Sequence, residues 1–344
     1  MRATQLSNKK SVSVTAAARL HMGFLDPNAS LGRKFGSIGV ALNEISTRLI
    51  LSRGSNSEIP DAKQSTRAYQ HLKKFRTELH LPDDVSVNVL ETIPEHAGLG
   101  SGTQMSLAIG AGLNELFGLN LTVRDIARIS ERGARSGIGI GCFEQGGLIV
   151  DGGRADTTLT PPVIARMEVP NQWRFILIFD NSGQGLNGNG EVEAFKSLSA
   201  FPEQSAARIC HLLLMQGLPA LAENNSKDFG NVITEIQQSV GDYFASAQGG
   251  RFTSPSVESA VEWLGRHGAL ALGQSSWGPT GFCLVANVDK AEQLLREVQS
   301  YFIDKADLQF KLVSARNKGA DIEIRPDNSG VDEVNYNSSL GIGV

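Results

Sequence analysis

Cysteine is scarce in this sequence of 344 residues. Cys142, Cys210 and Cys283 lie far apart, with no CxxC pair and no nearby pair of histidines. Neither a disulfide framework nor a structural zinc site is therefore expected. We expect all three cysteines to be small buried side chains of a protein from a reducing compartment.

An excess of basic charge and long hydrophobic runs are also lacking. The 32 lysines and arginines stand against 36 aspartates and glutamates, and no window interleaves basic with aromatic side chains. A dedicated nucleic-acid-binding protein is not expected. Arg19 and His21 interrupt the alanine-rich N-terminal stretch, and no run reaches the roughly 18 apolar residues of a membrane span. We expect a soluble cytoplasmic protein.

Glycine is abundant instead, with 37 residues that form clusters and so allow backbone to approach a ligand closely. The length suits two domains. Residues 157–170 are rich in threonine and proline and show no helical period, which predicts a domain boundary. We expect an N-terminal domain over 1–160, a C-terminal domain over 161–325 and a polar tail over 326–344.

The first domain is predicted to mix strands and helices. Alternating β-branched and polar residues predict strands over 11–17, 39–52 and 86–91. Helices are predicted over 61–80 and 103–117, the second apolar nearly all round and ended by Gly118. Thr122 and Asp125 form a capping box that opens a further helix, which Gly133 closes.

The second domain is predicted to follow a β-α-β-β-α-β order with one helical insertion, which is typical of a ferredoxin-like unit. The predicted strands cover 173–179, 269–272, 282–286 and 308–313, and the helices 203–216, 228–244, 255–264 and 289–302. The fold class is therefore α+β.

The strongest local signal reads Pro94-Glu95-His96-Ala97-Gly98-Leu99-Gly100-Ser101-Gly102-Thr103 and leads directly into the apolar helix. A glycine-rich turn at a helix start presents unpaired backbone N–H groups to an anion. Each dipole contact contributes only about 0.3 to 1 kcal/mol, so a diphosphate needs several such groups, the two hydroxyls and a metal ion. The motif is neither Walker A nor a dinucleotide fingerprint. A helix start that only needs small residues for packing is the alternative.

Residues 94–101 resemble the second motif of the GHMP kinases, a Pro-x-x-x-Gly-Leu-Gly-Ser-Ser run at the start of a buried helix. Residues 18–23 and 273–280 fit the same superfamily, so the resemblance spans most of the chain. It implies a two-domain GHMP-kinase-like fold, with an N-terminal domain similar to domain 2 of ribosomal protein S5 and a ferredoxin-like C-terminal domain. The site is then expected in the cleft between them.

One motif departs from the kinases of this superfamily. Those that use an aspartate base carry it in Ser-Gly-Ile/Val-Asp, and the matching place here reads Ser136-Gly137-Ile138-Gly139. Glycine removes the group that would accept the proton of a substrate hydroxyl. Residues 19–26, 136–153 and 276–279 more closely resemble one branch, the β-ribofuranosylaminobenzene 5′-phosphate synthases.

That resemblance implies a reaction of methanopterin biosynthesis. Phosphoribosyl pyrophosphate is joined to 4-aminobenzoate, or to 4-hydroxybenzoate, with loss of pyrophosphate and CO2. Pyrophosphate departs with negative charge, which a helix N-terminus and Mg²⁺ stabilise. The residues expected to hold the pyrophosphate are Gly98, Leu99, Gly100, Ser101, Gly102 and Thr103. A homodimer is also implied.

Four further residues are candidates for contact with the organic part of the substrates. His21 and Asp26 are expected near the ribose or the aromatic acid, and ordinary turn positions are the alternative. Arg19 and Arg135 are expected to pair with a carboxylate or a 5′-phosphate, since guanidinium groups bind either with two hydrogen bonds. Surface ion pairs are the alternative for both.

The remaining candidates lie in loops and turns. Glu144 is a candidate proton acceptor or metal ligand, and Ser101 with Glu131 forms a weaker metal-ligand prediction. Loop positions expected to contact a phosphate, with tight turns as the alternative, are Ser136, Gly137, Ser275, Ser276, Trp277, Gly278 and Thr280.

Two other functions stay open at this point. An ATP-dependent small-molecule kinase of the same superfamily is the main alternative, and Gly139 weighs against it. A non-catalytic relative that binds a phosphorylated metabolite is the third hypothesis, and it predicts saturable binding without turnover.

Overall fold

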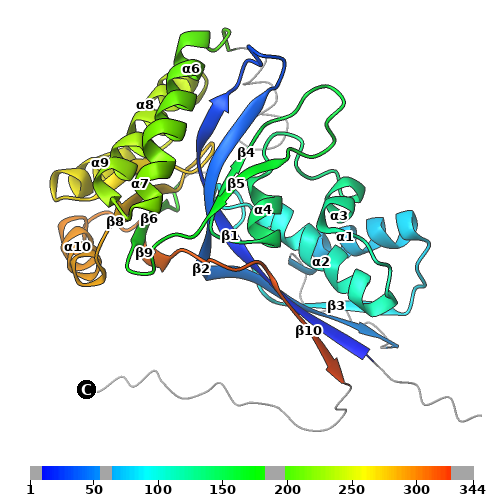
Figure 1. Ribbon diagram of the computed structural model, residues 1–344. Coiled ribbons are helices and arrows are strands. Elements are labelled where there is room, and N and C mark those ends of the chain that lie inside the picture. Colours follow the sequence, from blue (N-terminus) through cyan, green and yellow to red (C-terminus); the bar gives the residue numbers. More distant parts are fainter. Residues whose placement is uncertain (1–9, 55–63, 183–197, 327–344) are drawn as a thin grey trace, which may run out of the picture.

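The computed structural model describes residues 10–54, 64–182 and 198–326, and therefore leaves the predicted polar tail outside except for its first residue (Figure 1). Its larger sheet has six strands in the order β10-β1-β2-β4-β5, with β3 paired to β2 beside that path. The strands are β1 (Lys10–Asp26), β2 (Phe35–Arg53), β3 (Val85–Glu91), β4 (Leu148–Asp151), β5 (Val163–Met167) and β10 (Asp321–Pro326).

Four helices accompany this sheet: α1 (Gln64–Leu79), α2 (Ser101–Phe117), α3 (Val123–Ile129) and α4 (Ile138–Glu144). Helix α2 is buried along most of its length, as its apolar sequence predicts, and ends at Gly118 in the left-handed conformation. The predicted capping box of Thr122 and Asp125 is present. Helix α3 stops four residues before Gly133, because Glu131 takes a left-handed φ of 57°.

Strand β1 contributes to two different hydrophobic cores along its length. Its pairing with β2 is irregular between Ala17 and Arg19. Before this point Val14 packs in a core with α2, and beyond it Leu20 packs in a second core. Since neighbouring strand residues face opposite sides, Arg19 and His21 are directed away from that second core. The irregularity therefore determines the direction of two predicted site residues, Arg19 and His21.

The smaller sheet has the ferredoxin-like order β7-β8-β6-β9, which confirms the predicted fold class. Its strands are β6 (Arg174–Asp180), β7 (Leu270–Gln274), β8 (Gly281–Val285) and β9 (Leu308–Ser314). The accompanying helices are α6 (Glu203–Leu212), a π-helical turn over Leu213–Gly217, α7 (Leu218–Ala222), α8 (Ser226–Gln248), α9 (Pro255–Arg266) and α10 (Val288–Tyr301).

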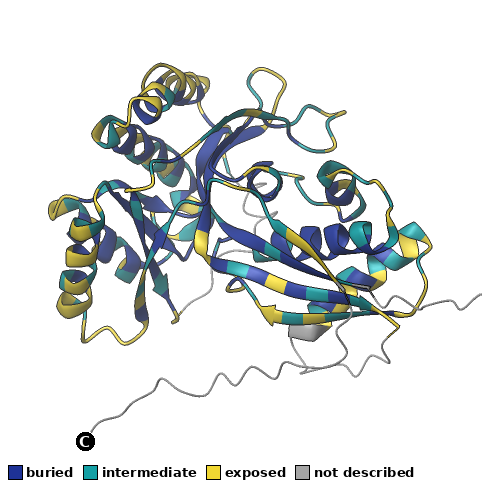
Figure 2. Ribbon diagram, turned by 60° about the horizontal axis from the view of Figure 1, so that its bottom comes forward, coloured by how far each residue is buried: buried dark blue, intermediate teal, exposed yellow. Residues whose placement is uncertain are grey.

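One hydrophobic core joins the two sheets. Leu20 of β1, Ile236 of α8 and Phe282 of β8 belong to the same buried cluster. A separate cluster fills the space between the smaller sheet and helices α9 and α10. Figure 2 shows buried residues in both parts of the molecule and in the strands between them. The two parts are therefore packed together and hold the residues at their junction in fixed positions.

Two features differ from the sequence-based expectations. Strand β5 pairs with β4, and β10 returns at the end of the described chain to pair with β1, so both extend the larger sheet beyond residue 160. Cys142 and Cys283 are buried, but the prediction for Cys210 is wrong, since it is exposed on α6. No helix among the described residues is long and apolar enough to cross a membrane.

Candidate active site

A cleft of about 490 Å³ lies where β1, the glycine-rich loop and the loop after β7 meet. It gathers most of the predicted site residues from four distant segments. The residues lining it are Arg19, His21, Phe24, Arg67, His96, Gly98, Leu99, Gly100, Ser101, Gly102, Thr103, Glu131, Arg132, Gly133, Ala134, Arg135, Ser136, Ser276, Trp277 and Gly278.

The glycine-rich loop ends in an uncapped helix start at one side of this cleft. Helix α2 follows Gly100, which is left-handed with φ of 84°, and no side chain of residues 10–54, 64–182 or 198–326 caps its first turn. The first N–H groups of a helix have no partner within it, and the helix dipole makes this end positive. Ser101 adds a hydroxyl at the same end. The arrangement suits a phosphate or diphosphate group.

The glycine-rich loop is held by both sheets. The Ser275 hydroxyl donates to the Gly98 carbonyl at 2.8 Å and accepts from the His21 N–H at 3.0 Å. Arg19 also donates to the Gly98 carbonyl. A Cβ on Gly98 would lie 2.3 Å from the Ser275 carbonyl oxygen, so this close approach requires glycine. Ser275 itself is buried behind the cleft and supports the loop.

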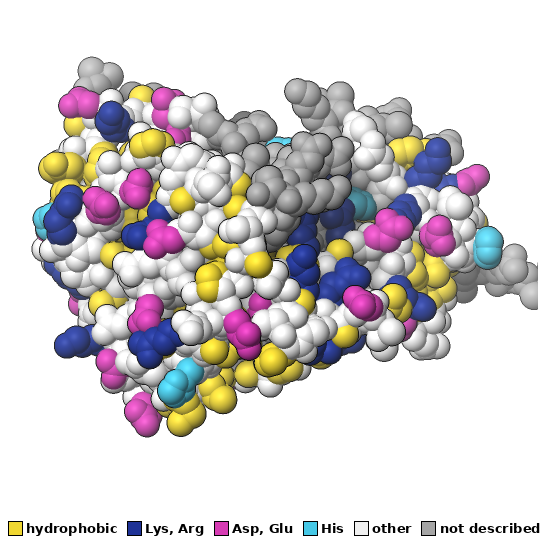
Figure 3. Space-filling model, turned by 90° about the horizontal axis from the view of Figure 1, so that it is seen from above, with side chains coloured by type: hydrophobic (Ala, Val, Ile, Leu, Met, Phe, Trp, Pro, Cys, Tyr) yellow, Lys and Arg dark blue, Asp and Glu magenta, His cyan; other side chains and the backbone are white. Residues whose placement is uncertain are grey.

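Four arginines make the cleft strongly cationic: Arg19, Arg67, Arg132 and Arg135 all line it. Seen from above, Lys and Arg side chains gather near the middle of the molecule (Figure 3). A Cβ on Gly102 would lie 2.4 Å from the Arg67 guanidinium and 3.6 Å from that of Arg132. Both guanidinium groups therefore stand beside the first turn of α2, where they add to its attraction for an anion.

The positive charge of these arginines contributes to the pKa shifts of nearby groups. Burial, Arg132, Arg67 and Lys74 together lower the pKa of His71 to about 4. Burial and Arg67 likewise lower the pKa of Arg132. Both shifts arise because additional positive charge is disfavoured at this place. A bound anion would offset that repulsion.

His21 lines the same cleft and is only 2% exposed. Burial, followed by the charge of Arg19, lowers its pKa to about 3. The imidazole is therefore neutral at physiological pH, and its buried Nε2 atom has no hydrogen-bond partner within the described part of the chain. Its ring packs against Phe24 with centroids 4.6 Å apart.

The start of α4 differs from that of α2. The Asp151 carboxylate accepts hydrogen bonds from the Gly137 N–H at 2.8 Å and from the Ser136 hydroxyl at 3.3 Å. Burial raises the pKa of Asp151 to about 6, although the Gly153 and Gly137 N–H groups favour its ionised form. Ser136 lines the cleft, whereas Gly137 does not.

Three other predicted residues lie outside the cleft lining. Asp26 accepts hydrogen bonds from Asn28 and from both the N–H and the hydroxyl of Ser30, and so stabilises its own turn. Glu144 ends α4 beside Arg124, at 3.6 Å, and burial raises its pKa. Thr280 is fully buried at the far end of the loop from Ser275.

The described part of the chain contains no group of three or more residues able to hold a metal ion by themselves. Among the described residues that line the cleft, Glu131 is the only carboxylate, and it pairs with Lys74 at 2.9 Å. The Ser101 hydroxyl lies on the same lining. Any divalent ion here would depend on oxygen atoms of the substrate for the rest of its ligands.

Several lining residues had no signal in the sequence. Arg67 lies on α1, and Arg132 follows α3 in a turn, so neither belongs to a recognisable motif. The period of α1 offers one clue, because Arg67, His71 and Lys74 are spaced to share one helix face. That pattern is also typical of a solvated face, so it does not identify a site.

Comparison with known proteins agrees with this architecture. Residues 65–147 match the model of the GHMP kinases N terminal domain, and residues 218–304 match that of the GHMP kinases C terminal domain. The beta-ribofuranosylphenol 5′-phosphate synthase of Archaeoglobus fulgidus is 33% identical over 323 residues, which cover 89% of this chain and 98% of that protein. The protein of the same name from Methanocaldococcus jannaschii is 34% identical over 252 residues, which cover 65% of this chain and 76% of that protein.

Solved structures show the same fold at much lower identity. Mevalonate diphosphate decarboxylase from Staphylococcus aureus superposes with a TM-score of 0.64 at 16% identity and covers 92% of this chain and 99% of that one. At this identity the likeness establishes the fold alone.

Proposed function

Since the chain belongs to the β-ribofuranosylphenol 5′-phosphate synthases, a family with GHMP kinase domains, we propose that it transfers a 5-phosphoribosyl group to an aromatic acid. The donor is phosphoribosyl pyrophosphate, and the acceptor is 4-aminobenzoate or 4-hydroxybenzoate. The name of these relatives contains a phenol, which corresponds to the second acceptor. The observation that carries this proposal is the uncapped start of α2 inside a cleft lined by four arginines.

This arrangement suits the departure of pyrophosphate. As the bond between ribose C1 and the diphosphate oxygen breaks, its electron pair stays on the leaving group. The backbone N–H groups at Ser101 and Gly102, with Arg67 and Arg132 beside them, would stabilise that charge. They are held in place before the reaction begins, so no reorganisation is needed.

The new bond forms between ribose C1 and the ring carbon that carries the carboxylate. The ring supplies the electron pair, helped by donation from the para amino or hydroxyl group. The bond from the ring to the carboxylate then breaks, CO2 leaves, and its electron pair restores the aromatic ring. The products are the C-riboside 5′-phosphate, pyrophosphate and CO2, and no oxidant or reductant is required. Orientation of the two substrates is the main task of the enzyme.

We also propose that Mg²⁺ binds together with the diphosphate group of the donor. This ion binds phosphate substrates with only one or two protein carboxylates and neutralises their charge. The Ser101 hydroxyl and the Glu131 carboxylate on the cleft lining suit such a partial ligand set. A Glu131→Gln variant is expected to need more Mg²⁺ for half-maximal turnover.

A kinase reaction is less well supported. The position that would carry the base is Gly139, and a Cβ there would lie 3.0 Å from the Thr103 side chain. The Gly139 carbonyl accepts a hydrogen bond from Gln104 at 2.9 Å, which ties α4 to α2. This place is thus occupied by helix packing, and the cleft lining offers Glu131 as its single described carboxylate.

The test is release of labelled CO2. Purified protein is incubated with Mg²⁺, phosphoribosyl pyrophosphate and either acceptor labelled in its carboxyl carbon, with and without the donor. We expect donor-dependent CO2 in equal amount to pyrophosphate. Absence of CO2 while the same protein transfers phosphate from ATP to a hydroxyl substrate would overturn the synthase in favour of the kinase.

A further inference from the structure

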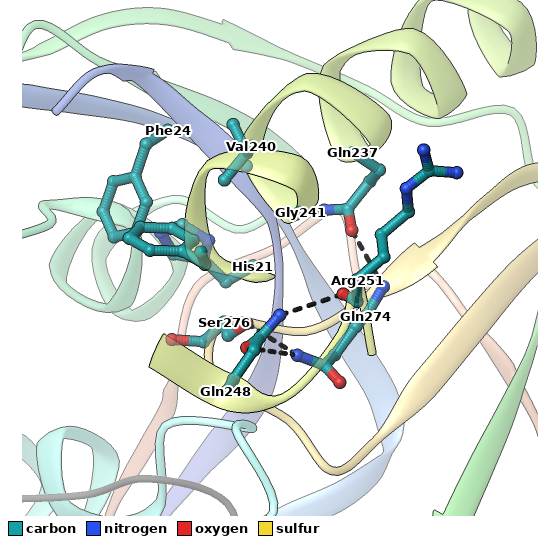
Figure 4. A pocket seen from close by; sticks show the side chains of 11 residues that line it. His21, Phe24, Gln237, Val240, Gly241, Gln248, Arg251, Gln274 and Ser276 are labelled. Carbon is teal, nitrogen blue, oxygen red and sulfur yellow. Dashed lines mark hydrogen bonds between the residues drawn. The ribbon is translucent and has the colours of Figure 1, made fainter. Parts of the chain in front are cut away.

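A second, much smaller cavity opens beside the cleft. It measures about 20 Å³ and lies between β1, α8 and the loop after β7 (Figure 4). His21, Phe24 and Ser276 line both this pocket and the cleft, so the two spaces meet at His21. We call it the para pocket, because its size and chemistry suit one end of an aromatic substrate.

The glutamines that line the para pocket already have partners. Gln237 donates to the Met22 carbonyl at 2.7 Å and accepts from the Gln274 N–H at 2.8 Å. Gln248 donates to the Arg251 carbonyl at 2.9 Å. These bonds connect α8, β1 and β7 and hold the walls in place. The glutamines therefore form a fixed frame.

His21 is the exception within this frame. Its Nε2 atom is buried, and none of the described residues offers it a hydrogen-bond partner. A neutral imidazole carries its proton on one nitrogen and accepts a hydrogen bond through the other. With the proton on Nδ1, Nε2 is a hydrogen-bond acceptor, and buried polar atoms in folded proteins normally have a partner. A ligand that supplies an N–H or O–H group would satisfy it.

The size of the pocket limits that group. A cavity needs about 10 to 15 Å³ of free volume to hold one water molecule. The free volume of about 20 Å³ in the para pocket therefore suits a single heavy atom with its hydrogens. An amino or a hydroxyl group fits, whereas a methylamino or methoxy group is too large without rearrangement.

The surrounding side chains suit an aromatic ring. Phe24 lies beside His21, and its ring centroid is 6.1 Å from that of Phe244, which in turn lies 4.3 Å from that of Trp277. Aromatic walls of this kind favour offset or edge contacts with a further ring. Phe24 and Trp277 also line the cleft, so the aromatic surface continues from the pocket toward the phosphate loop.

We propose, on the basis of the function proposed above, that the para pocket receives the amino or hydroxyl group of the aromatic acid and that His21 Nε2 accepts its hydrogen bond. Arg19 stands two residues before His21 in β1, so the two side chains leave the strand on the same face. The Arg19 guanidinium donates to the Gly98 carbonyl of the glycine-rich loop. Arg19 would then face the carboxylate end, beside the phosphate loop where the ribose must lie.

This assignment suits either of the two acceptors. Both para groups are of similar size and both donate a hydrogen bond, so His21 serves either. A para methyl group has a similar volume but donates nothing, and it would leave Nε2 buried and unsatisfied. We therefore expect 4-methylbenzoate to bind about ten-fold or more weakly than 4-aminobenzoate.

The experiment is equilibrium binding of the two acids to the full chain by calorimetry, with inorganic pyrophosphate present. Wild type is compared with His21→Phe, which keeps a ring but removes the acceptor, and with His211→Phe, an exposed control. We expect the preference for 4-aminobenzoate to fall to about one in His21→Phe and to persist in the control. An unchanged preference in folded His21→Phe overturns the proposal.

A second measurement does not depend on the Phe variant folding. The imidazole nitrogens are labelled with ¹⁵N, and the His21 signals are assigned with His21→Gln. Saturating 4-aminobenzoate should shift the Nε2 resonance, and 4-methylbenzoate should not. Equal shifts with both acids, or none with either, overturn the proposal. Neither readout requires turnover, so a synthase with an unchanged preference refutes the para pocket alone, and His21-dependent binding without CO2 release refutes only the reaction.

Discussion

Two buried helices of the N-terminal half begin directly after a glycine, and they differ in what lies at that glycine. Before α4 the Asp151 carboxylate accepts the Gly137 N–H at 2.8 Å. At α2 the described residues provide no side-chain cap after Gly100, and arginines such as Arg132 line the space in front. The helix dipole favours an anion at the N-terminus of each helix. A carboxylate of the chain lies at that place before α4, whereas α2 leaves it to a ligand.

A glycine-rich helix start can bind an external anion when no carboxylate of the protein lies at it. Glycine lets the backbone turn and be approached closely, and both helix starts have this property. The deciding difference is whether a carboxylate of the chain itself is folded onto the N–H groups. This difference has consequences for stability at α4 and for ligand affinity at α2.

The largest expected effect follows from removal of the carboxylate at α4. Asp151→Ala leaves the Gly137 and Gly153 N–H groups buried without an acceptor. At about 1 to 3 kcal/mol for each buried group, the free energy of unfolding should fall by about 2 to 5 kcal/mol. Urea unfolding measures this. Asp26→Ala, which removes a less buried turn carboxylate, is the control and should cost less; equal losses would mean that Asp151 is no special cap.

The converse change supplies α2 with a carboxylate. Ser101→Asp places negative charge at the first turn, where the dipole favours it by about 0.3 to 1 kcal/mol, so thermal stability should be kept or slightly raised. The same charge occupies the anion position, and we expect the affinity for phosphoribosyl pyrophosphate to fall about a hundred-fold. Ser101→Asn is the uncharged control and should lose much less. A variant that loses both stability and affinity would instead indicate a damaged fold.

A smaller effect is expected from the arginine beside α2. Arg132→Gln should weaken binding of the donor about ten-fold, because a hydrogen bond between charged groups is lost. Kinetic assays give the change as an increase in KM. Arg208→Gln is the control, since Arg208 is an exposed arginine that pairs with Glu235 at 2.9 Å. Equal effects of the two variants would argue against a role of the cluster in binding.

The smallest effects are opposite shifts of stability with pH. Burial and the surrounding cations lower the pKa of folded His71 from 6.5 to about 4, so the unfolded chain binds more protons between these values. The free energy of unfolding should therefore rise with pH from about 4 to 6.5. His71→Gln should remove that contribution. Unfolding of both proteins across this pH range measures it, and identical profiles would contradict the assignment.

Asp151 should act in the other direction. Burial raises its folded pKa from 3.8 to about 6, so the folded chain binds more protons in this window. The free energy of unfolding should therefore fall as pH rises from about 4 to 6. Asp151→Asn, which stays neutral throughout, should lose this slope while His71→Gln keeps it. The same slope in Asp151→Asn and wild type would disprove the raised pKa.

Much of the fold could be predicted because its signals are local. The capping box of Thr122 and Asp125 and the apolar run of α2 each lie within one short segment. The ferredoxin-like order follows from the alternation of strand and helix patterns in the second half. The glycine-rich loop was recognised for the same reason, since its ten residues are contiguous.

The rest depends on contacts between distant segments. Asp151 reaches Gly137 across 14 residues, and Arg67 reaches the α2 start only because α1 packs beside it. The irregularity in β1 that directs His21 into the cleft has no pattern in the sequence, nor do β5 and β10 as members of the first sheet. Asp26 and Glu144 carry suitable chemistry, but their backbone positions place them outside the cleft lining.

The central claim is that the uncapped start of α2 binds the diphosphate group. Calorimetric titration with inorganic pyrophosphate tests it most directly, using wild type, Ser101→Asp and the α4 variant Asp151→Asn. We predict that wild type and Asp151→Asn bind with similar affinity and that Ser101→Asp binds about a hundred-fold more weakly. Binding of pyrophosphate to folded Ser101→Asp with wild-type affinity would contradict the claim.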